Sequence, residues 1–311
     1  MTQASKSAII IFTMKKILWI QTGGTIFCKQ TPDGLLPGGN LLLGANRSPE
    51  AGIDVTPAVS GVSYDIINPF TLDSTDITPA HWQMLAREVF NNREKYDGFV
   101  ITHGTDTMQF CAAALSLMLI HFDKPVIFTG SMKPPHLPDS DASANLTAAF
   151  EAVRDMKQGV FVAFGGKLIP GISCVKTHTT ENDAFTDAGG GFSVVYDNSP
   201  PVLRDKLCEK VFYFKITPNV NKDIIDFILE KEYRGVVCEV FGLGGIPRSL
   251  LERLGALVKS GVRVIAVSQC LFGSVDFNVY AAHKKAAEIG IEAWDMTGSA
   301  ALVRLMLELG N

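Results

Sequence analysis

The chain has 311 residues, 47% of them hydrophobic, and carries a formal net charge of −4 from 28 lysines and arginines against 32 aspartates and glutamates. A chain of this length can bury a substantial core, and it predicts about two domains of ~150 residues each. The basic residues are spread along the sequence without interleaved aromatic residues, which argues against a nucleic-acid partner. No apolar run reaches the ~20 residues that cross a bilayer, so we expect no membrane partner.

The first residues include a short apolar stretch, Ala8 to Phe12. A secretory signal needs a core of ~7–15 apolar residues and a small-residue cleavage site, and neither is present. We therefore expect a cytoplasmic protein. Met14 is a candidate native start, which would leave residues 1–13 as a dispensable tail.

Apolar runs alternate along the chain with helical patterns. Such runs are typical of strands that are buried on both faces of a parallel sheet. The strands expected are 17–20, 98–102, 125–129, 159–164, 211–216, 235–241 and 262–267. Helices are expected over 79–91, with Thr78 as N-cap and Pro79 as first residue, and over 108–121.

This alternation predicts an α/β fold with a larger N-terminal parallel-sheet domain, flavodoxin-like, and a smaller C-terminal α/β domain. The segment Asp197 to Pro201 breaks the periodicity before the strand that starts at Val211. We expect an N-terminal domain over 1–196, a linker over 197–210 and a C-terminal domain over 211–311.

The six cysteines lie far apart and include no Cys-x-x-Cys pair. They are Cys28, Cys111, Cys174, Cys208, Cys238 and Cys270. This distribution is typical of reduced cytosolic thiols that act as small apolar residues. No cluster of histidine, cysteine and carboxylate residues has the close spacing of metal ligands, so we expect neither a metal nor a cofactor.

Two of the expected strands end in turns of threonine and glycine, Thr22-Gly23-Gly24-Thr25-Ile26 and Thr102-His103-Gly104-Thr105-Asp106-Thr107. Ligands bind at the carboxyl ends of strands in open α/β sheets. Glycine lets the backbone approach a substrate and threonine offers a hydroxyl nucleophile, so the pair indicates an acyl-transfer site.

A single turn of this kind also has an ordinary structural explanation, because a threonine hydroxyl can bond its own backbone. Asp106 is harder to explain in that way, since a charge at a strand end needs a partner or a ligand. Lys176 is a candidate partner. His103 is interpreted as a residue that shapes the turn, with a proton shuttle as the alternative.

These motifs resemble the bacterial-type L-asparaginase family, the threonine amidohydrolases, over essentially the whole chain. The two turns are similar to the first and second signatures of the family. Segments 128–132, 139–146 and 175–180 follow in the order of the family, and Asp295-Met296-Thr297 resembles the cytoplasmic, type I branch.

The resemblance implies hydrolysis of L-asparagine to L-aspartate and ammonia. It implies that Thr25 is the primary nucleophile on a mobile loop. Thr105, Asp106 and Lys176 would form the second half of the site, a hydroxyl oriented by a lysine that a carboxylate holds in place.

Substrate binding is also implied by the resemblance. Ser74 would hold the α-carboxylate of the substrate, with Thr75 and Gly104 as further binding residues, and Asp106 would take the α-ammonium. A homodimer or homotetramer is implied as well, in which the second domain of one protomer completes the site of its neighbour.

The chain departs from the family at three positions. Leu35 stands where members usually carry a lid tyrosine that polarises the nucleophile. Gly245 replaces an asparagine. Glu239 stands where members regulated by asparagine tend to place arginine, and a carboxylate would repel such an effector, so that regulation is not expected.

Two alternatives to asparaginase activity remain open. One is another amidase role, either glutaminase-like or that of an amidotransferase subunit acting on misacylated transfer RNA, although that subunit normally carries an extra N-terminal domain. The other is a ligand-binding member without turnover, which the leucine at position 35 favours and the retained threonines and lysine oppose.

Overall fold

The computed structural model of the protein describes residues 14–32, 34–36, 57 and 59–310. The first domain is built on a six-stranded sheet in the order β4-β1-β5-β7-β8-β9. Its strands are β1 (Lys15–Gln21), β4 (Val62–Ile67), β5 (Gly98–Thr102), β7 (Pro125–Thr129), β8 (Gly159–Phe164) and β9 (Lys167–Pro170). All neighbours run parallel except β8 and β9. The five parallel strands follow the flavodoxin-like order 2-1-3-4-5, as the sequence predicts.

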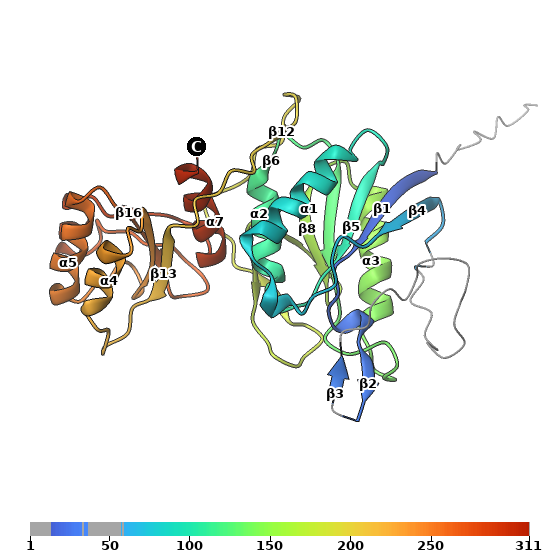
Figure 1. Cartoon of the computed structure of the whole chain (residues 1–311), viewed down its shortest axis with the longest axis horizontal. Helices are drawn as coiled ribbons and strands as arrows, with labels where there is room; N and C mark the ends of the chain where they lie inside the picture. The colour runs from blue at the N-terminus through green and yellow to red at the C-terminus, as the bar shows by residue number, and fades with distance from the viewer. Residues whose placement is uncertain (1–13, 33, 37–56, 58, 311) are drawn as a thin grey trace, which may run out of the picture.

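Helices cover both faces of this sheet (Figure 1). Helices α1 (Pro79–Asn91) and α2 (Met108–Met118) pack on one face, and α3 (Ala142–Asp155) packs on the other. The side chains of β1 alternate between the two layers, because Leu18 lies in the core under α1 and α2 whereas Trp19 lies in the core under α3. Both faces are therefore buried.

The expected start of the first helix is confirmed. Pro79 is the first residue of α1, and Thr78 at the N-cap donates its backbone N–H to Nδ1 of His81 at 3.0 Å. The expected helix over 108–121 is too long. It ends at Met118 because Leu119–Ile120 form β6, which pairs with β12 (Val202–Leu203).

The second domain contains a parallel sheet in the order β13-β14-β15-β16. Its strands are β13 (Val211–Lys215), β14 (Gly235–Val240), β15 (Arg263–Ser268) and β16 (Glu292–Ala293). Its helices are α4 (Asp223–Glu230), α5 (Arg248–Lys259), α6 (Ala281–Glu288) and α7 (Gly298–Leu309). Helices α4, α5 and α6 contribute to one core, and α7 packs on the opposite face of the sheet.

Helix α7 also joins the two domains, and Figure 1 shows it between the two sheets. Val303 and Leu307 lie in the core of the first domain, beside α2, whereas Ala301 and Leu305 pack on the sheet of the second domain. The expected linker contains β12, which pairs back to the first domain. We propose that the chain passes into the second domain after β12, within 197–210.

Shorter elements frame the carboxyl edge of the first sheet. They are the 3₁₀ turns η1 (Thr25–Phe27) and η3 (Ser74–Asp76), the hairpin of β2 (Lys29–Thr31) and β3 (Gly34–Leu36), and the hairpin of β10 (Cys174–Lys176) and β11 (Phe185–Asp187). No helix in the described part of the chain is long and apolar enough to cross a membrane.

Candidate active site

The loops that leave β1 and β5 meet at the point where the strand order reverses. In doubly wound sheets this switch point opens a crevice in which ligands bind. Thr25 follows β1 and Thr105 follows β5, so the topology brings both threonine turns to this crevice. The sequence motif and the strand order therefore indicate the same site.

Two glycines let the loops approach closely. Gly24 has φ 91°, and a Cβ on it would lie 2.6 Å from the backbone nitrogen of Gly104. A Cβ on Gly104 would in turn lie 2.7 Å from the hydroxyl oxygen of Ser74. A side chain at either position would clash with its neighbour. The two glycines therefore allow the segments that carry Thr25, Thr105 and Ser74 to lie next to one another.

The second half of the predicted site is assembled around Lys176. Its Nζ lies 2.8 Å from Oγ1 of Thr105 and 2.7 Å from Oδ1 of Asp106. The Lys176 side chain is 15% exposed and that of Asp106 is 60% exposed. The buried hydroxyl of Thr105 thus faces the amine, while the carboxylate remains open to a ligand.

Gln109 positions Lys176, a role that is not predicted from the sequence. Its Oε1 accepts the backbone N–H of Lys176 at 2.7 Å, which ties β10 to the first turn of α2. A glutamine in the first turn of a helix carries no signal of this role, because its partner is 67 residues away.

The expected substrate-binding residues lie in different environments. Ser74 is 4% exposed, and its carbonyl accepts the hydroxyl of Thr107 at 2.7 Å, which links η3 to the second turn. Thr75 is exposed, and its hydroxyl donates to the carboxylate of Asp73 at 2.8 Å. The Thr75 hydroxyl is therefore already bonded to the carboxylate of Asp73, which caps η3.

His103 is buried and bonded at both ring nitrogens. Nδ1 lies 2.7 Å from the carbonyl of Gly104 and Nε2 lies 3.0 Å from Sγ of Cys111. Burial lowers the pKa of His103 to about 4 and raises the pKa of the Cys111 thiol. A neutral ring with its proton on Nδ1 satisfies both contacts, with the thiol as donor to Nε2. This geometry favours the interpretation that His103 shapes the turn.

Asp141 and Asn145 lie in the family-like segment 139–146, to which the sequence assigns no role for either residue. The Asp141 carboxylate accepts the backbone N–H groups of Met132 and Lys133, each at about 3 Å, and Nδ2 of Asn145 at 2.9 Å. Asn145 also donates to the carbonyl of Gly130. The pair therefore fixes the loop after β7. Its i, i+4 spacing at the start of α3 was the available signal.

Leu35 lies in β3, opposite Gln30 in the hairpin that follows Thr25. Among the described residues, no group of three or more histidine, cysteine, aspartate or glutamate side chains could hold a metal ion. The site contains hydroxyls, an amine, a carboxylate and the backbone N–H groups of glycine-containing turns. These are the groups that acyl transfer requires.

Comparison with known proteins agrees with this fold. The family described as asparaginase, N-terminal matches residues 16–204, and the glutaminase/asparaginase C-terminal domain matches residues 210–311. An L-asparaginase from Thermococcus kodakarensis is 34% identical, over 95% of this chain and 93% of the relative. The structure of the thermostable L-asparaginase from that organism has a TM-score of 0.83 at 32% identity, covering 95% of this chain and 93% of the other.

Two further relatives widen the comparison. A glutamyl-tRNA(Gln) amidotransferase subunit from Pyrococcus furiosus is 36% identical over 78% of this chain and 61% of the relative. A structure named as a probable cytoplasmic L-asparaginase from Campylobacter jejuni has a TM-score of 0.75 at 26% identity, covering 95% of each chain. With both domains matched in order and the two threonine turns at one crevice, the chain belongs to the asparaginase family of amidohydrolases.

Proposed function

We propose that the protein hydrolyses L-asparagine to L-aspartate and ammonia. The observation that carries this proposal is the position of Lys176 Nζ, within hydrogen-bond distance of both the Thr105 hydroxyl and the Asp106 carboxylate. A protein that only binds its ligand has no need for this combination. The relatives named as L-asparaginases support the same substrate.

In this proposal the substrate is held at both charged ends. Asp106 accepts the α-ammonium group, since its side chain remains 60% exposed while its Oδ1 bonds to Lys176. Ser74 and the backbone of Gly104 bind the α-carboxylate, with Thr75 at the rim. These contacts would present the side-chain amide to the two threonines, which is the proximity that an acyl-transfer site must provide.

The chemistry then needs a nucleophile, a base and an oxyanion site. Thr25 Oγ1 attacks the amide carbon, its proton passes to the amide nitrogen, that nitrogen leaves as ammonia as the C–N bond breaks, and an ester of Thr25 remains. Water, activated by the Thr105 and Lys176 pair, attacks that ester and restores the Thr25 hydroxyl. Backbone N–H groups of the glycine-containing turns stabilise the oxyanion in both steps, each donor being worth ~3–4 kcal/mol where it has been measured.

Hydrolysis of another side-chain amide is the second candidate. It is favoured by the 36% identity to an amidotransferase subunit, although this chain spans only 61% of that protein. One methylene separates asparagine from glutamine, a difference worth only ~1–3 kcal/mol in a pocket, so a family site can accept either.

Ammonia release from asparagine, from glutamine and from a buffer blank tests the proposal directly. We expect kcat/KM for asparagine to exceed that for glutamine. Faster release from glutamine would replace the proposal by the second candidate. Release no faster than the blank with either amide, while the protein still binds one of them, would show a binding protein without turnover.

We also propose a cytoplasmic homodimer or homotetramer. Large apolar side chains gather on the loops that follow β14 and β15 and on the segment before α6. They are Phe241, Leu243, Leu271, Phe272, Val279 and Tyr280, each at least 37% exposed. Contact with a second copy of the chain would remove this surface from water. Light scattering at micromolar concentration should give twice or four times the mass of 33.7 kDa of one chain.

A further inference from the structure

A series of buried hydrogen bonds lies beneath the turn that carries Thr105. His103 is 1% exposed, and Cys111, near the start of α2, is fully buried. Nδ1 of His103 lies 2.7 Å from the carbonyl oxygen of Gly104, and Nε2 lies 3.0 Å from the sulfur of Cys111. The contacts therefore connect α2, through the imidazole, to the backbone next to Thr105.

The direction of these hydrogen bonds follows from the groups that make them. A carbonyl oxygen only accepts, so Nδ1 of His103 carries the proton that is donated to Gly104. Burial lowers the pKa of His103 to about 4, so the ring is neutral near neutral pH and Nε2 has a free lone pair. Burial also raises the pKa of Cys111, so the thiol keeps its proton and donates it to Nε2. The imidazole is thus held between one acceptor and one donor.

The indole of Trp82 supports this direction from α1. Trp82 is 6% exposed, and its N–H makes no hydrogen bond of ordinary geometry in the part of the chain that the structure describes. It lies close enough to the sulfur of Cys111 to oppose part of the rise in the pKa of the thiol. A donor near the sulfur leaves the S–H group to point toward the imidazole.

The imidazole in turn fixes one peptide of the second threonine turn. The C=O and N–H groups of a trans peptide point in opposite directions, so a Gly104 carbonyl bonded to His103 directs the N–H of Thr105 away from the buried ring. Within the described residues this N–H has no hydrogen-bond partner. A free backbone donor beside the Thr105 hydroxyl can stabilise negative charge on a substrate oxygen.

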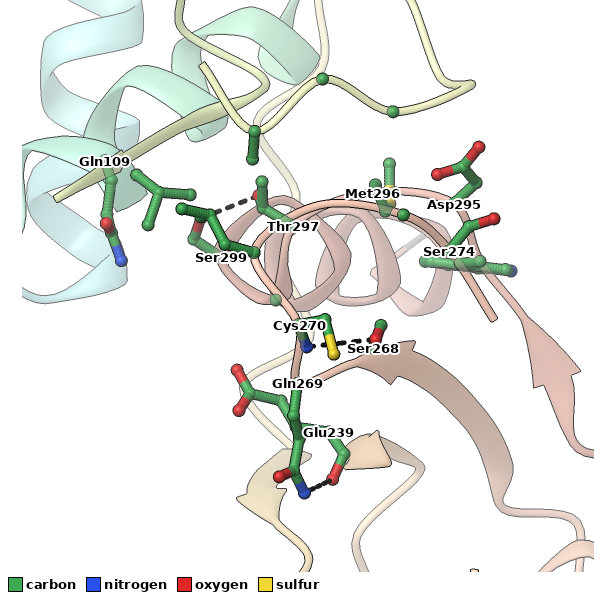
Figure 2. A pocket seen from close by; sticks show the side chains of 18 of the residues that line it. Gln109, Glu239, Ser268, Gln269, Cys270, Ser274, Asp295, Met296, Thr297 and Ser299 are labelled. Atoms are coloured by element: carbon green, nitrogen blue, oxygen red, sulfur yellow. Dashed lines mark hydrogen bonds between the residues drawn. The ribbon is translucent and has the colours of Figure 1, made fainter. Parts of the chain in front are cut away.

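Helix α2 therefore holds both partners of the second half of the proposed site. Gln109, which Figure 2 labels among the residues that line a pocket, accepts the backbone N–H of Lys176 at 2.7 Å. Cys111 lies two residues further along the helix and reaches His103. Thr105 Oγ1 and Lys176 Nζ, which are 2.8 Å apart, are thus positioned from one helix by two different side chains.

We propose that Cys111 is a positioning residue for amide hydrolysis, which holds the His103 ring against the Gly104 carbonyl and thereby orients the peptide between Gly104 and Thr105. Cys111 itself touches no substrate. The proposal rests on the proposed function, because an effect on the reaction requires turnover of an amide. The effect on the imidazole can be measured without turnover.

Nitrogen NMR of protein that carries isotope-labelled histidine tests the hydrogen bonds of the ring. The His103 signal is the one that the His103→Asn spectrum lacks. In wild type it should show a protonated Nδ1 and a bare Nε2. Cys111→Ala should move the Nε2 resonance and speed exchange of the Nδ1 proton, because the ring loses its donor, whereas Cys111→Ser retains a donor and should resemble wild type.

Steady-state ammonia release tests the effect on the reaction, with asparagine or glutamine, whichever the wild type hydrolyses faster. Cys111→Ala should lower kcat about tenfold or more, the loss expected when a buried acceptor is left without its donor. KM should change much less, because the oriented peptide serves the transition state. Cys111→Ser should recover most of the lost kcat.

Cys238→Ala is the matched control, because it removes another buried thiol, from β14 in the other domain. It should retain the kcat of wild type, and circular dichroism would confirm that each variant is folded. Equal kcat in Cys111→Ala and Cys238→Ala would overturn the positioning role, and so would a wild-type His103 that carries its proton on Nε2. A wild type that releases no ammonia would refute the proposed function, while the NMR spectra would still decide whether Cys111 holds the ring.

Discussion

Thr25 and Lys176 belong to the two halves of the proposed site, and the role of each can be tested by removing its hydroxyl or its amine. Thr25 begins η1 directly after Gly24, where a backbone with positive φ lets the loop lie against Gly104. Lys176 reaches the same crevice from β10, 71 residues after Thr105. The proposed chemistry divides between them, since one supplies the nucleophile and the other orients the second hydroxyl.

The first prediction concerns the nucleophile. Thr25→Val preserves the shape of the side chain and removes its oxygen, so kcat for ammonia release should fall at least ~10³-fold, a loss of about 4 kcal/mol in transition-state stabilisation. Thr25→Ser retains a hydroxyl and is the control, which should keep most of the activity. Near-normal turnover by Thr25→Val would move the assignment to Thr105.

The second prediction is that Thr105 and Lys176 act in one step, because their side chains share a hydrogen bond of 2.8 Å. Thr105→Val and Lys176→Met should each strongly reduce kcat, and the double variant should be little slower than either. The readout is kcat under saturating asparagine for all four proteins. Losses that add in free energy would show that the two side chains serve separate steps.

The third prediction follows from the burial that lowers the pKa of His103 from 6.5 to about 4. As the pH falls through this range, the unfolded chain takes up a proton that the folded protein excludes, so stability falls with decreasing pH. The shift corresponds to ~3 kcal/mol in the free energy of unfolding.

Urea unfolding at neutral pH and at about pH 4 measures how much of the free energy of unfolding is lost through protonation of His103. His103→Asn should lose ~3 kcal/mol less than wild type on acidification, since it has no imidazole to protonate. His136→Asn removes a histidine that lies outside the core and should behave as wild type. Equal acid losses in wild type and His103→Asn would be incompatible with a buried neutral ring.

At the scale of elements, the hairpin of β2 and β3 follows the nucleophile directly. Leu35 lies in β3, at the position where the resemblance to the family leads us to expect a tyrosine. A phenol there would polarise the Thr25 hydroxyl, so Leu35→Tyr should raise kcat more than it changes KM. Leu36→Tyr adds the same phenol one position along the strand and is the control. A wild type that already turns over asparagine rapidly, with no gain in Leu35→Tyr, would assign activation of Thr25 to another group.

The elements that could be predicted from sequence are those with continuous apolar runs. Strands β5 and β7 coincide with their expected ranges because they are buried throughout. Strand β4 has no continuous apolar run to mark its bounds, because it lies at the sheet edge, half-buried, with Asp65 exposed in its middle. The end of α2 was misplaced because the apolar pattern continues into β6, and His121, with φ 49°, marks a break that periodicity does not show.

The residues of the candidate site also fall into those that could be predicted from the sequence and those that could not. Thr105, Asp106 and Lys176 were predictable because their residue types and motif context signal reactive chemistry, and the structure brings them within hydrogen-bond distance. The role of Gln109 was not predictable, because it depends on a contact between segments far apart in the chain. No local pattern encodes such contacts.

At the scale of the whole molecule, α7 ties the two domains through its opposite faces. Leu307 is 2% exposed in the core of the first domain, and Leu305 is fully buried against the sheet of the second. Arg304, which precedes both in sequence, stacks 4.0 Å from the ring of Trp294 and pairs with Glu308. A helix buried on both sides cannot leave one domain without disturbing the other.

The last prediction tests this coupling. Leu305→Ala and Leu307→Ala should each lower the free energy of unfolding by ~2–5 kcal/mol, the range for a leucine removed from a core. Leu229→Ala, at a leucine that is 38% exposed on α4, is the matched control and should cost much less. Because α7 belongs to both cores, both core variants should shift one common unfolding transition when fluorescence and circular dichroism are followed together. Two separate transitions, each moved by only one of the variants, would mean that the domains unfold independently and that α7 does not couple them.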